Sequence, residues 1–146
     1  EIQSESEITL EAIRGNSIEI KLEFDGSSAA EYGIKVCCSP DGEEQTVISY
    51  HAAEAALKVD TRHSGPEESP KHVESAPLEL GADDKLQLRI FVDKSVVEVF
   101  ANNRQAIMRR IYPAGSNSTQ VRLFSTGGSS TVRQLESWHI SPSNPY

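Results

Sequence analysis

The amino-acid sequence predicts an all-β protein built as a two-sheet antiparallel β-sandwich. About ten short segments alternate apolar and polar residues with a period of two, as in a strand with one buried face. Turn-forming residues separate these segments roughly every eight to twelve positions, which is typical of sandwiches. No segment sustains the period of a helix, although residues 52–57 could form one helical turn. The 146 residues are expected to form a single domain, residues 1–146, with its own core.

The N-terminal half contains five expected strands. In the clearest, Ser17–Asp25, four apolar residues alternate without a fault with polar and charged residues, and a shorter strand, Ile8–Ile13, precedes it. Three more strands are expected at residues 34–38, 46–50 and 57–60, with the turn Pro40-Asp41-Gly42 between the first two. Residues 61–77 are mostly polar and contain three prolines, so we expect a long loop, either functional or a surface connection between sheets.

The segment from Leu86 to Pro113 is predicted to form three consecutive antiparallel strands at the centre of the fold. Apolar residues occupy every second position in its first two strands. A two-residue loop at Lys94-Ser95 places both sets on one face, because an odd loop would separate them. Asn102-Asn103 is expected to form a second two-residue turn, since asparagine tolerates positive φ. That turn would place Met108 opposite Val97.

The reverse face of these three strands is expected to be mixed. In the expected register Glu98 lies diagonal to Arg89 and Arg109, which predicts a structural ion-pair network and not a catalytic site. A sheet face that met only water would be polar, so the apolar residues on this face indicate a second buried surface. The candidates for a domain or subunit interface are Phe91, Phe100, Ile107 and Ile111.

Two strands are expected after Pro113, at residues 120–125 and 131–140, and one fault in the alternation of the second predicts a β-bulge. Between Pro113 and the first of them, Asn117-Ser118-Thr119 forms an N-glycosylation sequence, so Asn117 is a candidate acceptor. Trp138 and Tyr112 could stack on a sugar, but we expect core or interface positions for both.

The composition excludes several functions. A net charge of -8 and a pI near 5.0 argue against nucleic-acid binding, because phosphates would be repelled. No apolar run approaches the ~20 residues of a membrane span, and no signal-like segment is present. Cys37 and Cys38 are adjacent and cannot readily bond to each other, and four scattered histidines lack zinc-type spacing, so no metal site is predicted.

The run from Phe91 to Asn102, followed by residues 109–113, resembles the C-terminal β-sandwich of glycoside hydrolase family 32, which includes invertases, inulinases and levanases. Further matching segments occur in that family's order, at residues 32–42, 57–60, 76–78 and 135–138. The resemblance spans residues 18–140 and implies a lectin-like, concanavalin-type sandwich. One departure is Asn102-Asn103, where the family often has Asn-Gly.

The resemblance implies a parent enzyme that hydrolyses the β-fructosidic bonds of sucrose or fructans. Its catalytic groups would lie in an N-terminal five-bladed propeller, in Asn-Asp-Pro, Arg-Asp-Pro and Glu-Cys motifs, none of which occurs here. We therefore assign no catalytic residue, substrate-binding residue or cofactor, and we expect the chain alone to be inactive. Its expected partners are the propeller and, in a homo-oligomer, a second copy.

The first residue is Glu1, not Met, which favours a domain of a longer protein, and a secreted parent is favoured over a cytoplasmic one. Two other hypotheses remain open. The chain could be a carbohydrate-binding module for fructan or another glycan, or an unrelated structural or adhesive sandwich. The latter would have no reason to share the ordered motifs.

Overall fold

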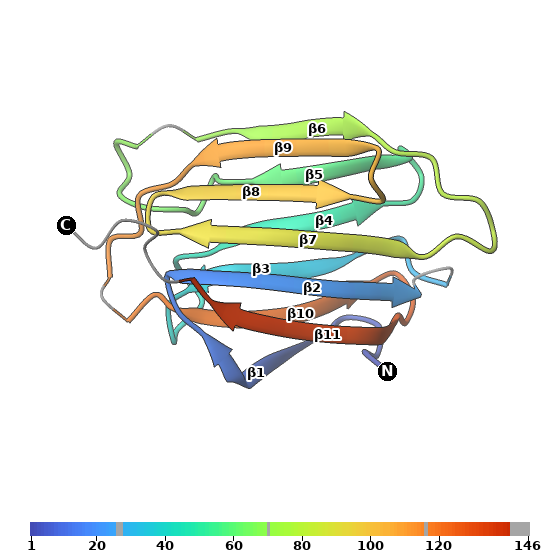
Figure 1. Ribbon diagram of the computed structural model, residues 1–146, viewed down its shortest axis with the longest axis horizontal. Coiled ribbons are helices and arrows are strands. Elements are labelled where there is room, and N and C mark those ends of the chain that lie inside the picture. Colours follow the sequence, from blue (N-terminus) through green and yellow to red (C-terminus); the bar gives the residue numbers. More distant parts are fainter. Residues whose placement is uncertain (26–27, 70, 116, 141–146) are drawn as a thin grey trace.

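The computed structural model describes residues 1–25, 28–69, 71–115 and 117–140. It is a sandwich of two antiparallel sheets packed face to face (Figure 1). Within the described residues, one sheet has six strands in the order β1-β10-β3-β4-β5-β6, and the other has five in the order β11-β2-β7-β8-β9. The strands are β1 (Ser6–Arg14), β2 (Ser17–Asp25), β3 (Glu31–Cys38), β4 (Thr46–His51), β5 (Ala56–Asp60), β6 (Val73–Pro77), β7 (Leu86–Asp93), β8 (Val96–Ala101), β9 (Gln105–Arg110), β10 (Gln120–Thr126) and β11 (Thr131–His139).

The structure confirms the predicted fold class and the first central hairpin. β7 and β8 are joined by Lys94 and Ser95, and Val92 pairs with Val97 as expected. The predicted bulge in the last strand is also present, as a register shift between Val132 and Gln134 where β11 pairs with β2. In the part of the chain that the model describes, no helix is long and apolar enough to cross a membrane.

The predicted loop over residues 61–77 is wrong at its C-terminal end, because residues 73–77 form β6. This strand pairs with β5 along the edge of the six-stranded sheet. Its sequence, Val-Glu-Ser-Ala-Pro, has little apolar alternation, since most of its side chains are exposed and its order comes from backbone pairing. The expected helical turn at residues 52–57 is also absent: β5 begins at Ala56, after a residue with positive φ.

The second central turn differs from the prediction by one residue. Ala101 pairs with Gln105, so the loop contains Asn102, Asn103 and Arg104, and both asparagines adopt positive φ. A loop of three residues reverses the facing of every side chain in β9, because side chains alternate along a strand.

The altered register of β9 changes which of its side chains are buried. Ile107 pairs with Val99 and enters the core, where it is 6% exposed. Met108, expected on the apolar face, points outward and is 68% exposed.

The core lies between the two sheets and is formed by their inner faces. β2, β7 and β8 contribute the longest apolar rows, which match the alternation in the sequence. On the six-stranded sheet, Tyr32 packs edge-on against Phe24 with ring centroids 5.4 Å apart, and it also contacts Tyr50. The Tyr50 hydroxyl donates a hydrogen bond to the carbonyl of Leu78, so its polar end is satisfied within the core.

Candidate functional site

The expected network of Glu98, Arg89 and Arg109 does not form in the structure. Arg109 pairs with Val97 in the backbone register, so its side chain and that of Glu98 belong to opposite faces of the sheet. Arg109 reaches Glu74 of β6, with 2.9 Å between Nη1 and Oε2. The ion pair therefore links the edges of the two sheets, since β9 and β6 lie side by side there (Figure 1).

Arg89 stays on the outer face but pairs with a different carboxylate. Its Nε lies 2.7 Å from Oε2 of Glu19, on the neighbouring strand β2. Glu98 is half-buried between Phe91 and Met108 in the sheet register, and its carboxylate makes no hydrogen bond or ion pair with the described residues. The predicted network does not form because the three-residue turn places Arg109 on the other face of the sheet from Glu98.

Of the four residues expected at an interface, the structure leaves two on the surface. Ile107 and Ile111 are 6% and 1% exposed and belong to the core, again because the second turn shifts the facing of the strand. Phe91 and Phe100 lie on the outer face of the five-stranded sheet. Their rings meet edge to face, with centroids 6.0 Å apart.

Two more large apolar side chains are exposed on this outer face. Trp138 of β11 is 46% exposed, so it is not a core residue, and Met108 lies at the opposite edge on β9. The register places Trp138, Glu19, Phe91, Glu98 and Met108 in one row across all five strands. The row thus carries three large apolar side chains, of which Trp138 and Met108 are exposed, and two carboxylates. Exposed apolar groups rimmed by polar residues are typical of a surface that meets another molecule or domain.

A groove of about 880 Å³ occupies the other half of the same face. Strands β2 and β7 contribute side chains to it, Phe91 and Phe100 form its aromatic part, and residues 102–105 line one end. The guanidinium of Arg89 lies 5.2 Å from the centroid of the Phe91 ring, so a charged group covers one face of that ring. The groove combines aromatic and polar surface on a rigid sheet.

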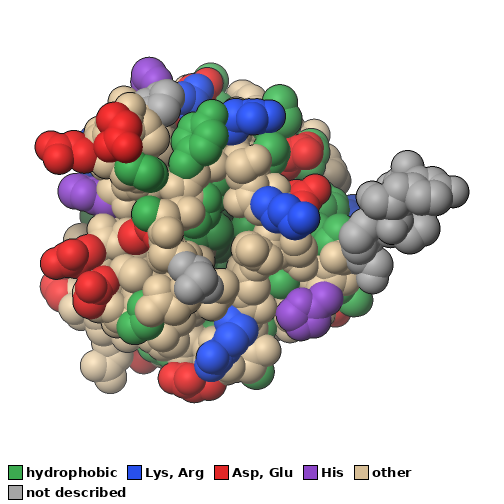
Figure 2. All heavy atoms as spheres, turned by 90° about the vertical axis from the view of Figure 1, so that its left-hand side faces the viewer, with side chains coloured by type: hydrophobic (Ala, Val, Ile, Leu, Met, Phe, Trp, Pro, Cys, Tyr) green, Lys and Arg blue, Asp and Glu red, His purple; other side chains and the backbone are tan. Residues whose placement is uncertain are grey.

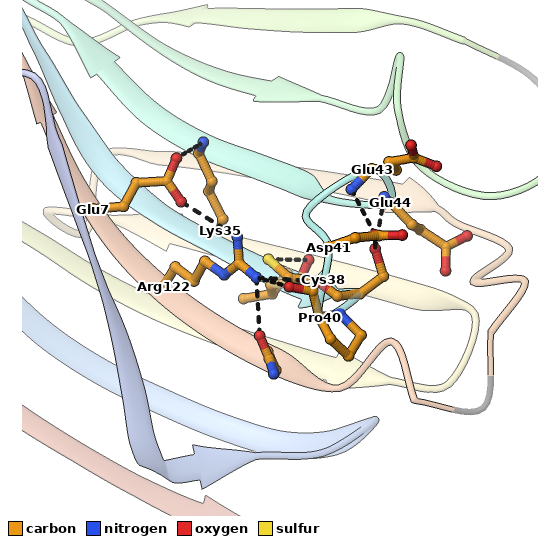
Figure 3. A network of polar contacts seen from close by, with 11 residues as sticks. Glu7, Lys35, Cys38, Pro40, Asp41, Glu43, Glu44 and Arg122 are labelled. Atoms are coloured by element: carbon orange, nitrogen blue, oxygen red, sulfur yellow. Dashed lines mark hydrogen bonds and ion pairs between the residues drawn. The ribbon is translucent and has the colours of Figure 1, made fainter.

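The outer face of the six-stranded sheet carries an ion-pair network in place of apolar groups (Figure 3). Glu7 of β1 pairs with Lys35 of β3 at 2.7 Å and with Arg122 of β10 at 3.6 Å. Arg122 Nη2 also donates hydrogen bonds to the carbonyls of Ser39 and Pro40. The network joins three strands and fixes the turn after β3, which is a structural role.

One carboxylate, that of Glu44, is held in the turn between β3 and β4 (Figure 3). Glu44 accepts hydrogen bonds from the Ser118 hydroxyl and from the backbone N–H groups of Gly65, Ala114 and Gly115. Burial alone would raise the pKa of this carboxyl, but the hydrogen bonds outweigh it and hold the pKa of Glu44 below its ordinary value. An ionised, fully engaged carboxylate here serves to fix loops.

The end of the sandwich around Glu44 carries further surface groups. In Figure 2, acidic side chains gather along one side and hydrophobic side chains line a central hollow. Asn117, the candidate glycosylation residue, is exposed beside the buried Ser118, and Tyr112 is exposed as well.

Carboxylates gather at a second pocket, where all of them are engaged with other groups. A smaller pocket of about 340 Å³ on the six-stranded sheet is lined by Glu5, Glu7, Glu31 and Asp60. Each of these carboxylates already has a partner: a backbone N–H for Glu5, and a basic side chain for the other three. No group of three or more His, Cys, Asp or Glu side chains among the described residues could hold a metal ion.

Sequence reasoning missed the polar residues of the groove and the role of Glu44. In the sequence, the polar positions of β2 and β7 indicate only a solvent-facing side. The order of the strands in the sheet is what brings together Lys21, Glu23 and Gln87. Glu44 is one acid among 22, and its partners lie 21 to 74 positions away. The alternation in β2 and β7 does predict that these polar side chains share a face of each strand, whereas no feature of the sequence distinguishes Glu44 from the other acidic residues.

The fold and these surfaces define a lectin-like β-sandwich. A galectin structure from Caenorhabditis elegans superposes on 94% of this chain and 90% of the galectin, with a TM-score of 0.63 and 12% identity, which shows the fold alone. The family model described as glycosyl hydrolases family 32 C terminal matches residues 1–139. The chain belongs to this family of C-terminal domains.

Two relatives of the chain are much longer than the region that matches it. A levanase from Bacillus subtilis is 38% identical over 128 residues, which cover 83% of this chain and 18% of the levanase. The crystal structure of exo-inulinase from Aspergillus awamori superposes with a TM-score of 0.81 and 27% identity over 96% of this chain and 30% of that protein. The chain therefore spans less than a third of the length of either relative.

Proposed function

We propose that this chain is the non-catalytic C-terminal domain of a β-fructosidase, and that it stabilises the catalytic module by packing against it. The observation that carries the proposal is the match of residues 1–139 to a C-terminal domain family, together with coverage of only 18% of the levanase. Most of such a polypeptide lies outside this domain. The parent would hydrolyse the β-fructosidic bonds of sucrose or fructans, the class to which levan and inulin belong.

The charge states of the carboxyl groups support a non-catalytic role. A glycosidase of the common type uses two carboxyl groups that flank the bond, and its general acid has a raised pKa. Asp60, which lines the pocket of the six-stranded sheet, has its pKa lowered: burial opposes this change, but hydrogen bonds and the charge of Arg62 outweigh it. The larger groove is lined by a single carboxylate, that of Glu23, among the described residues. The larger groove therefore lacks a second carboxylate, and the four carboxylates of the smaller pocket are held in hydrogen bonds or ion pairs.

The row that includes Trp138 and Met108 is our candidate docking surface for the catalytic module. Its two exposed large apolar side chains lie at opposite edges of one sheet, and a partner that covers both would span five strands. The opposite sheet is a poorer candidate, because an ion-pair network involving Glu7, Lys35 and Arg122 covers part of its outer face. We propose the five-bladed propeller implied by the resemblance as the occupant, and a second copy of the chain as the competing one.

Activity assays on the isolated chain and on the polypeptide that its gene encodes test this function. The 146-residue chain should release no fructose from sucrose, inulin or levan, whereas the whole polypeptide should release fructose from at least one of them. A whole polypeptide from which these residues are deleted should melt at a lower temperature. Fructose release by the isolated chain, abolished by a substitution inside it, would overturn the proposal.

A further inference from the structure

The groove on the outer face of the five-stranded sheet has no role in the stability or docking proposed above. Its volume of about 880 Å³ lies within the range of about 300–1,000 Å³ that small-molecule sites occupy. Phe91 is the one residue that the groove shares with the row from Trp138 to Met108, and the other groove residues lie outside that row.

An exposed aromatic ring forms the apolar part of the groove. The Phe100 ring is 39% exposed, and Phe91 supports it edge to face from the neighbouring strand. Because Arg89 covers one face of Phe91, Phe100 is the ring left to meet a ligand. A sugar can place its C–H groups on such a ring while its hydroxyls face outward.

The polar part of the groove offers both donors and acceptors in fixed positions. Gln87 Nε2 donates to Glu23 Oε1 at 3.0 Å, which leaves the side-chain amide oxygen of Gln87, Oε1, without a partner among the described residues. Gln134 is held in the same way by Glu136, at 3.1 Å. Side chains that are already positioned lose little entropy when a ligand binds. Hydroxyl groups both donate and accept, so mixed amide and carboxylate groups suit them.

The charges around the groove favour a neutral ligand over an anion. Its three basic residues are Lys21, Arg89 and Arg104. Arg89 pairs with Glu19 at 2.7 Å, and Glu136 stands directly opposite Lys21 in the sheet. Three carboxylates, those of Glu19, Glu23 and Glu136, belong to the same strands as these basic groups or to the strand beside them, so the groove does not concentrate a field that would select a phosphate or an acidic peptide.

We propose that this groove binds a short neutral oligosaccharide, with Phe100 as the stacking platform and Gln87 as a hydrogen-bonding group. The choice of a β-fructan as the sugar rests on the proposed function; the amphipathic site itself does not. A second sugar site on this domain would hold the polymer near the catalytic module while the module acts on its end.

Titration of the 146-residue chain with inulin-type and levan-type fructo-oligosaccharides, followed by amide chemical shifts in NMR, tests the proposal. Shift changes should concentrate at residues 21–23, 87–91 and 100–106. Phe100→Ala should weaken binding about tenfold or more, and Gln87→Ala about fivefold. Met108→Ala is the matched control, because Met108 is exposed on the same face outside the groove, and it should bind like the parent chain.

Three outcomes would overturn the site. The first is an absence of shift changes with both fructans and malto-oligosaccharides at tens of millimolar, the second is binding that both groove variants leave unchanged, and the third is shift changes confined to residues outside the groove. Binding of malto-oligosaccharides in place of fructans would overturn the choice of a β-fructan and support the site. None of these depends on the catalytic module, so failure of the groove is distinguishable from failure of the proposed function, which the fructose-release assay reports.

Discussion

The carboxylate of Glu44 accepts a hydrogen bond from the hydroxyl of Ser118, which lies 74 positions further along the chain. The same carboxylate accepts backbone hydrogen bonds from Gly65 and Ala114. One side chain thus joins the turn before β4, the connection between β5 and β6, and the connection between β9 and β10. Within the second of these, the ammonium of Lys71 donates to backbone carbonyls 5 to 7 positions earlier, so this long connection is held at two points.

Replacement of Glu44 by Gln should reduce stability by about 1–3 kcal/mol at neutral pH, because charge-assisted hydrogen bonds become neutral ones and one amide donor faces other donors. Urea denaturation of the 146-residue chain measures the loss. Glu43→Gln is the control, since its side chain is exposed and makes no hydrogen bond with the described residues. Equal losses in the two variants would contradict the assignment.

The stabilisation from Glu44 should depend on pH in one direction. Its pKa in the folded chain lies below the ordinary value of 4.5, so the unfolded chain takes up the proton first as pH falls. The stability gap between the parent and Glu44→Gln should be constant near about pH 6 to 8 and shrink below about pH 4.5. Other lowered carboxyl groups, such as Asp60, are present in both proteins and cancel. A gap that stays constant to pH 3, or widens, would contradict this prediction.

Replacement of Glu98 by Gln should change stability by less than about 0.5 kcal/mol, because the described structure gives Glu98 no ionic partner to lose. This differs from the sequence-based expectation of a buried network. Ile107→Ala is the positive control and should cost about 2–5 kcal/mol, since Ile107 fills the core. A loss of stability of several kcal/mol for Glu98→Gln would contradict this prediction and support an ion-pair network at Glu98.

The two cysteines should resist thiol reagents in the folded chain. Both are free and buried, and burial raises the pKa of Cys37 to about 12 and that of Cys38 to about 11. The thiolate is the reactive species, so iodoacetamide at pH 8 should label neither residue in native protein and both in guanidinium. Rapid native labelling of either cysteine would show that this part of β3 opens readily.

The sequence was sufficient to predict the sandwich because its strands alternate strictly where one face is buried. β2 and β7 were placed nearly residue by residue, and the Lys94-Ser95 loop followed from the parity of two flanking apolar sets. Asn102-Asn103 was a weaker case, because the positive φ of both residues fits a loop of two or of three residues. β9 then offered apolar residues on both faces, Ile107 and Met108, and could not fix its own register.

The surfaces were less predictable, because they depend on strand order. The groove combines Gln134 of the last strand with Lys21 of the second and Gln87 of the seventh, an arrangement that alternation along one strand cannot reveal. Phe91 and Phe100 were expected on a shared face, but the sequence left open whether that face was the inner or the outer one; the structure places both on the outer face. Ile107 was expected on the same face as these two residues, and its burial in the core could be predicted only with the true length of the turn at residues 102–104.

Hydroxyl-radical footprinting of Met108 and Trp138 tests most directly whether this domain packs on a catalytic module. Both side chains oxidise readily and are exposed in the domain, so the isolated chain should be modified quickly at both. In the whole polypeptide encoded by the gene, both should be protected, while Tyr112 at the end of the sandwich serves as an internal reference. Equal oxidation of Met108 and Trp138 in the isolated chain and in the whole polypeptide would contradict docking through this face.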